Sequence, residues 1–178
     1  GTGTNGLAAL PYLYDLAHDA QANKLYGLTS DGVVAIDLAT GARTTWTSPA
    51  SPSTAAVSSP RQMALDKQGN RLLIADATRE NLVAVDLGTG AFTAFSESGA
   101  SGPAFGSVYG VAVDAGGTVW ALDFVDRLYK VDRTTGARTD VSSRLAGGSG
   151  SGVQLGNPWG AVRIDGSAAN PVAFSGAN

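Results

Sequence analysis

The acidic side chains of this chain are nearly all aspartates, with thirteen Asp and two Glu. A carboxylate can serve as a general base, a nucleophile or a metal ligand, but an Asp beside a turn usually accepts hydrogen bonds from the turn's own amides. The segment VDLGTG (85–90) has this pattern, because its Asp precedes a Gly that can supply a positive φ. IDLATG and VDRTTG repeat it. We therefore interpret Asp37, Asp86 and Asp132 as turn residues.

Other residue types that commonly carry chemistry are scarce. Cys is absent and His18 is the single histidine, which excludes thiol nucleophiles, disulfides and Cys or His-cluster metal sites from this sequence. No GxSxG elbow is present. GTGTNG (1–6) matches GxGxxG, but no strand precedes it and no helix follows. DKQGN, DAQAN and DGSAAN lack the Asp/Asn alternation and closing Glu of calcium loops. We expect no catalytic residue, metal site or cofactor.

The elements that position these residues follow from an internal repeat of about 48 residues. Gly41, Gly90 and Gly136 hold the same place in successive copies. The second copy contains four short strand patterns, RQMALD, RLLIAD, NLVAVD and AFTAF, separated by turn residues. No segment keeps a 3.6-residue apolar period, so no long helix is expected. A repeated unit of four antiparallel strands is typical of a β-propeller blade.

We predict an all-β fold, with residues 1–178 forming one partial propeller domain of about 3.5–4 blades. The expected blades span about 10–48, 60–98, 107–143 and 158–178. The last offers only GAVRID and PVAFSG, two of four strands, so the ring is expected to be incomplete. Either the chain is a piece of a longer propeller, or a second chain completes the ring as in a homodimer. An open ring would leave blade faces and strand edges exposed, which is an aggregation risk.

Two polar residues interrupt apolar positions of the repeat. His18 stands where other copies have Leu65 or Val113, and Arg163 stands where they have alanine. Both lie in the terminal copies, where a further blade or another chain would be met. One interpretation is that His18 and Arg163 face this junction. The other is that both are satisfied, half-buried side chains at the ends of the fold.

One segment resembles a known group of propellers. SVYGVAVDAGGTVWALDFVDRLYKVD (107–132) resembles a blade of the NHL, YVTN and gluconolactonase-like propellers, and the resemblance extends over about 10–178. It implies the fold but no single activity, because the group includes lactonases, lyases, sensor domains and scaffolds. The gluconolactonase-like enzymes hold a divalent metal such as calcium through carboxylate and amide ligands in the channel. At the matching positions this chain has Tyr109 and Arg61, and only Asn157 is an amide.

In a propeller, the residues that precede the innermost strands surround the mouth of the central channel. Aromatic rings with an Arg and an Asn at this place suit a sugar or another small polar ligand, although the same side chains could simply fill the channel. The candidate ligand-binding residues are Tyr12, Tyr14, Arg61, Tyr109, Asn157 and Trp159.

The composition limits the class of function. The chain is 43% hydrophobic and 15% charged with a net charge of −3, and no basic stripe predicts nucleic-acid binding. Its apolar runs are too short to span a membrane. Gly1 begins no signal peptide, so we expect any such segment either to have been removed or to be left out of this sequence. Loops rich in Ser, Thr, Ala and Gly favour a secreted or periplasmic bacterial protein. We expect a non-enzymatic binding or scaffold module; the alternative is part of a metal-dependent lactonase or lyase.

Overall fold

The computed structural model describes residues 12–51, 53–97, 99–125 and 127–143, together with the backbone of two short strands at 162–163 and 173–174. Within this part of the chain every regular element is a β-strand. The strands are β1 (Asp15–Asp19), β2 (Lys24–Thr29), β3 (Gly32–Asp37), β4 (Arg43–Thr47), β5 (Pro60–Asp66), β6 (Arg71–Asp76), β7 (Asn81–Asp86), β8 (Phe92–Ser96), β9 (Val108–Val113), β10 (Val119–Asp123), β11 (Arg127–Val131), β12 (Arg138–Ser143), β13 (Val162–Arg163) and β14 (Ala173–Phe174).

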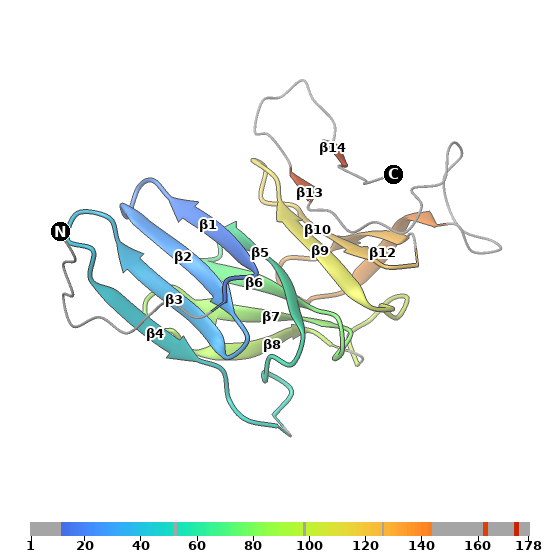
Figure 1. Cartoon of the computed structure of the whole chain (residues 1–178). Coiled ribbons are helices and arrows are strands. Elements are labelled where there is room, and N and C mark those ends of the chain that lie inside the picture. The colour runs from blue at the N-terminus through green and yellow to red at the C-terminus, as the bar shows by residue number, and fades with distance from the viewer. Residues whose placement is uncertain are drawn as a thin grey trace.

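These strands form three four-stranded antiparallel sheets, each in sequence order, which we name blade 1 (β1–β4), blade 2 (β5–β8) and blade 3 (β9–β12). β13 pairs with β14 in a two-stranded sheet. The first strand of each sheet is the innermost, since β1 contacts β5, β5 contacts β9, and β9 contacts β13 (Figure 1). Sheets stacked with their first strands around one axis form a β-propeller. The predicted fold class is therefore confirmed, with a ring that the described strands leave incomplete.

The repeat in sequence is a repeat in pairing register. In blade 1, His18 lies opposite Leu25; in blade 2, the equivalent Leu65 lies opposite Leu72. Residues at equivalent positions can therefore be compared directly between blades, and a difference between copies shows which residue types that position accepts.

Hydrophobic packing between the blades explains why the second strand is apolar on both faces. Leu72 and Ile74 of β6 belong to a core cluster shared with blade 1, whereas Leu73 and Ala75 belong to one shared with blade 3. All four side chains are fully buried. Successive residues of a strand point to opposite faces, so a central strand placed between two sheets needs apolar residues at every position.

The hairpin between the third and fourth strands is built as the sequence predicts. Asp86 Oδ1 accepts hydrogen bonds from the N–H of Gly88 at 3.0 Å, the N–H of Thr89 at 2.8 Å and the Thr89 hydroxyl at 2.9 Å. These bonds, led by the one from the Thr89 N–H, hold the pKa of Asp86 below its ordinary value. Gly90 closes the turn at φ 71°, and Asp37 and Asp132 accept equivalent bonds in the other blades.

Candidate functional site

One residue from each blade stands at the start of the inner strand in the same position of the repeat. These residues are Tyr14, Arg61 and Tyr109, aligned on the aspartates that follow each inner strand. Tyr14 directly precedes β1, and its N–H donates to the carbonyl of Leu28 at 2.9 Å. Because β1, β5 and β9 are neighbours around the axis, the three residues come from adjacent blades at one end of the channel.

Two of these predicted site residues are in direct contact. The Arg61 guanidinium lies 4.8 Å from the centre of the Tyr109 ring, in a cation–π arrangement. The Tyr109 ring also packs against Phe124, which follows β10, at a centroid distance of 5.2 Å and an interplanar angle of 34°. Arg61 is exposed, whereas Tyr109 and Phe124 are half-buried. The stack therefore has a half-buried aromatic base and a cation on its outer side. We call Tyr14, Arg61, Tyr109 and Phe124 the mouth cluster.

The first blade adds a second aromatic pair. The rings of Tyr12 and Tyr14 meet edge to face at 5.2 Å and 80°. Their side chains are 79% and 42% exposed, so both rings are open to a ligand from solvent. Asn157 and Trp159, the remaining candidates, lie outside the described residues.

Polar side chains one residue further along the inner strands hold adjacent blades together. Asp15 Oδ2 accepts from the N–H of Met63 at 2.8 Å, and Gln62 Oε1 accepts from the N–H of Val111 at 3.0 Å. Burial raises the pKa of Asp15, and the hydrogen bonds from backbone amides offset this in part. These contacts were not predicted from the sequence, although Asp15 and Gln62 occupy one position of the repeat and form a recognisable polar pair.

Asp76, at the end of β6, is fully buried and has no ionic partner among the described residues. Its two oxygens accept four hydrogen bonds from backbone amides of the turn after β6 and of the loop before β5. The donors are Ser58, Ser59, Thr78 and Arg79. A carboxylate whose lone pairs are all engaged in this way is a structural anchor of two loops at the mouth end of the blade.

Asp123 plays the same role in blade 3, where it is also fully buried. Its Oδ2 accepts from the Tyr129 hydroxyl at 2.8 Å and from the N–H of Gly106 at 3.1 Å, while Oδ1 serves the turn after β10. Burial is the main reason that the pKa of Tyr129 lies far above its ordinary value. The phenol therefore stays protonated and remains a donor to Asp123.

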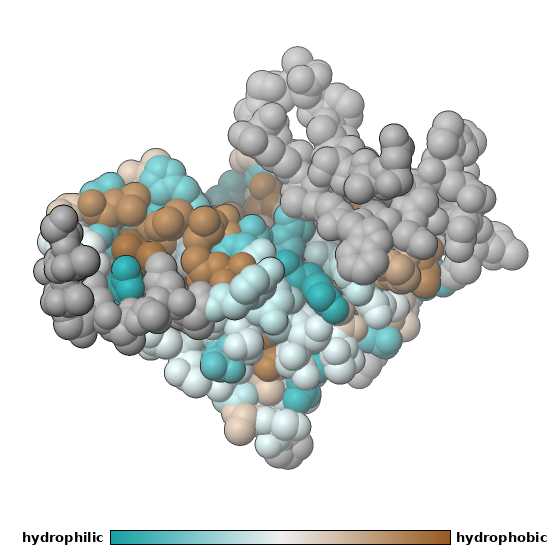
Figure 2. Space-filling view, in the orientation of Figure 1, coloured by the Kyte–Doolittle hydropathy of each residue, from teal (hydrophilic) through white to brown (hydrophobic). Residues whose placement is uncertain are grey.

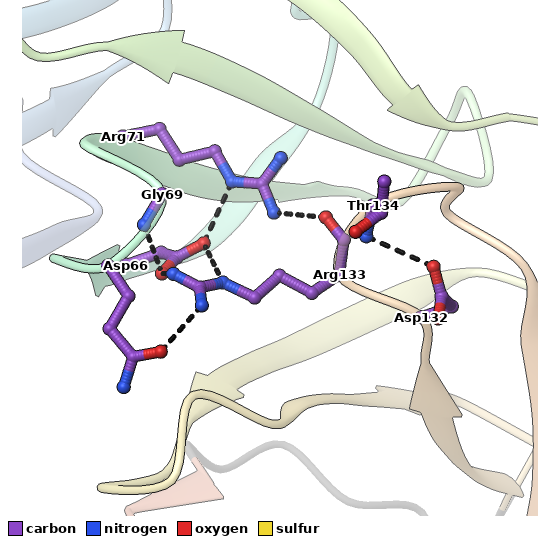
Figure 3. Close-up of polar contacts among 7 residues, drawn as sticks. Asp66, Gly69, Arg71, Asp132, Arg133 and Thr134 are labelled. Atoms are coloured by element: carbon purple, nitrogen blue, oxygen red, sulfur yellow. Dashed lines mark hydrogen bonds and ion pairs between the residues drawn. The ribbon is translucent and has the colours of Figure 1, made fainter.

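The opposite end of the blades carries a network of ions centred on Asp66, at the end of β5 (Figure 3). This fully buried carboxylate accepts from Arg71 Nε at 2.9 Å and from Arg133 Nη2 at 2.6 Å. The Gly69 N–H donates to it as well, at 2.9 Å. Burial alone would raise the pKa of Asp66, but the bonds from Arg133, Gly69 and Arg71 outweigh it and hold the pKa below its ordinary value.

A shallow cavity of about 320 Å³ lies beside this network, between the inner strands of blades 2 and 3. Its polar walls are already engaged: Asp66 is bound by two arginines, and Lys67 donates to Asp19 at 2.6 Å. Asp114 accepts from the indole N–H of Trp120 at 3.1 Å. These ionic groups join neighbouring elements of the fold, so the cavity has less to offer a ligand than the mouth cluster.

A buried arginine was also missed. Arg138 opens β12, a strand expected at the polar outer edge, yet its side chain is only 4% exposed. The guanidinium lies 4.6 Å from the centre of the Phe105 ring. It donates to the Ser96 hydroxyl and to carbonyls of the loop between blades 2 and 3, namely those of Glu97, Ala100 and Pro103. Arg138 therefore fixes that loop. The alternation of residue types along β12 did not indicate that this arginine is buried.

The expected junction residues are placed only in part. His18 is exposed on β1, on the face turned away from blade 2, whereas its counterparts Leu65 and Val113 pack against core clusters. Arg163 lies in β13, and its side chain is outside the described residues. The interpretation that both residues meet a further blade or chain stays a prediction.

No group of three or more His, Asp or Glu side chains in the part of the chain that the structure describes could hold a metal ion. Nor does that part contain a helix of the length and hydrophobicity needed to cross a membrane.

The fold recurs in proteins of known structure. The chain aligns with the structure titled nidogen/laminin complex (TM-score 0.63, 16% identity, 86% of this chain and 52% of that one). It also aligns with an auxiliary nutrient binding protein from Bacteroides thetaiotaomicron (TM-score 0.63, 14% identity, 86% of this chain and 33% of that one). A third similar structure is the extracellular domain of a putative hybrid two-component system from B. thetaiotaomicron. Its TM-score is 0.56 and its sequence identity is 17%, and the alignment covers 74% of this chain and 18% of that one. The chain thus spans about half or less of the length of these proteins.

A search of curated protein sequences found no match. A protein family described as outer membrane protein assembly factor BamB matches residues 18–158, which cover the three described blades almost completely and extend past them. This match includes more than half of the chain and agrees with the repeated four-stranded sheets. The chain belongs to the family described as outer membrane protein assembly factor BamB.

Proposed function

We propose that the chain is a non-enzymatic β-propeller binding module of an exported bacterial protein, and that it takes a sugar or another small polar ligand at the channel mouth. One observation carries this proposal: Tyr14, Arg61 and Tyr109 come from equivalent positions of three adjacent blades and present two rings and a cation at one end of the channel. Concave sites that combine aromatic surface with a few polar groups are typical of small-ligand binding.

The roles of the buried acids support binding over catalysis. Asp19, Asp66, Asp76 and Asp123 are at most 2% exposed, and each is engaged by turn amides, a phenol or cationic side chains. A general base must be able to reach a proton on a substrate. The candidate mouth residues that the structure describes are instead an arginine and tyrosines, whose side chains suit recognition.

The proposal also includes export of the protein from the cell and the group of propellers that its blades resemble. The family description and the titles of two similar structures refer to an outer membrane assembly factor, a nutrient-binding protein and an extracellular domain. We propose that the blades lie nearest to the NHL, YVTN and gluconolactonase-like group, because residues 107–132 resemble one of its blades. Asp123, within this segment, anchors loops as described above.

The open face of blade 1 supports a further proposal, that another blade completes the ring. Leu16 and Leu38 are 52% and 46% exposed, whereas the equivalent Met63 and Leu87 of blade 2 pack in the core shared with blade 1. Figure 2 shows hydrophobic residues gathered over the region where Figure 1 places β1 and β2. The blade could come from the same polypeptide or from a second chain. A light-scattering mass of a dimer that falls to a monomer in Leu16→Glu supports a second chain, and a wild-type monomer rules it out.

The binding proposal is tested by nuclear magnetic resonance with ¹⁵N-labelled protein and a panel of sugars. We expect at least one sugar to shift the amide signals of Tyr14, Arg61 and Tyr109, and Tyr109→Ala to abolish these shifts. Thr89→Ala, in a hairpin at the other end of blade 2, serves as the control and should bind normally. Shifts confined to other regions, or none with any sugar, would contradict the proposal. A calcium-dependent rise in melting temperature would instead favour the lactonase or lyase alternative.

A further inference from the structure

Arg61 differs from the ion-paired cations of blades 2 and 3 in what it contacts. Arg71 and Arg133 pair with Asp66, and Lys67 pairs with Asp19. Arg138 is saturated by carbonyls, as described above. Arg61 is exposed and has no acidic partner among the residues that the structure describes. Its guanidinium lies over the Tyr109 ring, 4.8 Å from the ring centre, so the ring covers one face of the guanidinium.

This arrangement leaves the donating edge of Arg61 available while the side chain is held in place. A guanidinium presents its N–H groups in a planar fork that matches the two oxygens of a carboxylate. The Tyr109 ring below it rests on Phe124, which is fixed through its own N–H to the carbonyl of Ser107 at 2.8 Å. A cation already ordered on an aromatic base loses less conformational entropy when it binds an anion.

The acid closest in sequence to the mouth does not neutralise this cation. Asp15 directs its carboxylate to the N–H groups of Leu16 and Met63, at 2.8 Å each. These bonds commit both oxygens to backbone amides below the mouth. An anion from solvent therefore does not compete with an internal carboxylate for Arg61 in the described part of the chain.

The surroundings indicate which kind of anion fits. The exposed rings of Tyr12 and Tyr14 lie at the adjacent blade, and flat aromatic surfaces with a polar tip suit the C–H face and hydroxyls of a sugar ring. The chain carries a net charge of −3, which disfavours an approaching polyanion such as an acidic peptide. A ligand with one negative charge avoids most of this repulsion.

We infer that the mouth cluster binds a sugar bearing a single carboxylate, a uronic acid, with Arg61 holding the carboxylate and the tyrosine rings holding the sugar ring. This inference rests on the proposed function and adds the ligand class to it. It predicts that charge on the ligand, and the fork geometry of Arg61, decide affinity at this site.

Isothermal titration with a matched pair of ligands, methyl glucuronide and methyl glucoside, tests the inference. We expect the charged sugar to bind about tenfold more tightly or better, as charge-assisted hydrogen bonds allow. Arg61→Gln should abolish this preference, and Arg61→Lys should restore only part of it, because an ammonium lacks the fork. Lys130→Gln removes one exposed positive charge from β11 and should leave the preference unchanged.

The outcomes separate the two levels of the proposal. Equal binding of both sugars, with mouth amides shifted, would overturn the carboxylate inference and leave the binding function standing. Binding of neither sugar at the mouth would overturn both. Tighter binding of a glutamate-rich peptide than of methyl glucuronide would assign the site to a protein partner and overturn the sugar assignment. Unchanged melting of each Arg61 variant verifies that it is folded.

Discussion

Replacing Asp66 by Asn should destabilise the protein by breaking the ionic link between blades 2 and 3. Asp66 is fully buried, and its partners Arg71 and Arg133 are only 17% and 27% exposed. Each hydrogen bond to a charged partner contributes about 1.5–3 kcal/mol. An amide keeps one acceptor oxygen but presents an N–H₂ group to a guanidinium. We therefore expect the free energy of unfolding to fall by about 3 kcal/mol.

Urea denaturation followed by circular dichroism measures this loss. Asp132→Asn is the matched control, because Asp132 also accepts turn amides but is exposed and lies outside the ion pairs, so its loss should be much smaller. Arg133→Leu introduces the leucine that the other two blades have at this position. In that background, Asp66→Asn should lower the free energy of unfolding by at least about 1 kcal/mol less than it does in the wild type. A loss below about 1 kcal/mol for Asp66→Asn alone would refute the reasoning.

The effect should also depend on pH in a defined direction. The pKa of folded Asp66 lies below its ordinary value of 3.8, so the charged form is the one that folding favours. Its stabilisation is complete above that value and is lost as the pH falls through the folded pKa. The difference between wild type and Asp66→Asn should therefore be constant from neutral pH down to about pH 5 and shrink in more acidic solution. A difference that grows on acidification would contradict this sign.

Other predictions concern single positions. Gly41→Ala should lower the free energy of unfolding by about 1 kcal/mol, because of the positive φ alone. Gly136→Ala should lower it by about 3 kcal/mol, because its Cβ would also overlap the Phe95 carbonyl. Equal losses in urea denaturation would contradict this. Asp15 has a raised pKa, so the wild type should lose stability relative to Asp15→Asn as the pH rises above about 4. Melting temperatures of both proteins at pH 4 and pH 7 measure this loss. An unchanged difference between the two proteins would contradict the prediction. Arg138→Met should cost about 3 kcal/mol in urea by leaving buried carbonyls unpaired; a loss below about 1 kcal/mol would count against the loop-fixing role.

Sequence reasoning predicted the features that repeat. Asp86 and its counterparts recur before a glycine in each copy because each blade needs the same turn, and the doubly apolar β6 follows from burial between two sheets. The mouth positions could be predicted for the same reason, since they precede each inner strand.

Contacts that do not repeat could not be predicted. Arg133 occupies a position where the other blades have leucine, and only the fold brings it to Asp66, a residue far away in the sequence. Arg138 looked like an edge residue because the loop that buries it comes from before blade 3. The Arg61–Tyr109 stack was expected as a shared region but not as a contact, because blade spacing and side-chain direction are not encoded in a local pattern.

The crystal structure of the chain with methyl glucuronide tests the central claim most directly. The account predicts the sugar at the channel mouth, its carboxylate within hydrogen-bonding distance of the Arg61 guanidinium and its ring against Tyr14 or Tyr109. A sugar bound in the cavity beside Asp66 or on the outer hairpins, with the mouth unchanged, would contradict it.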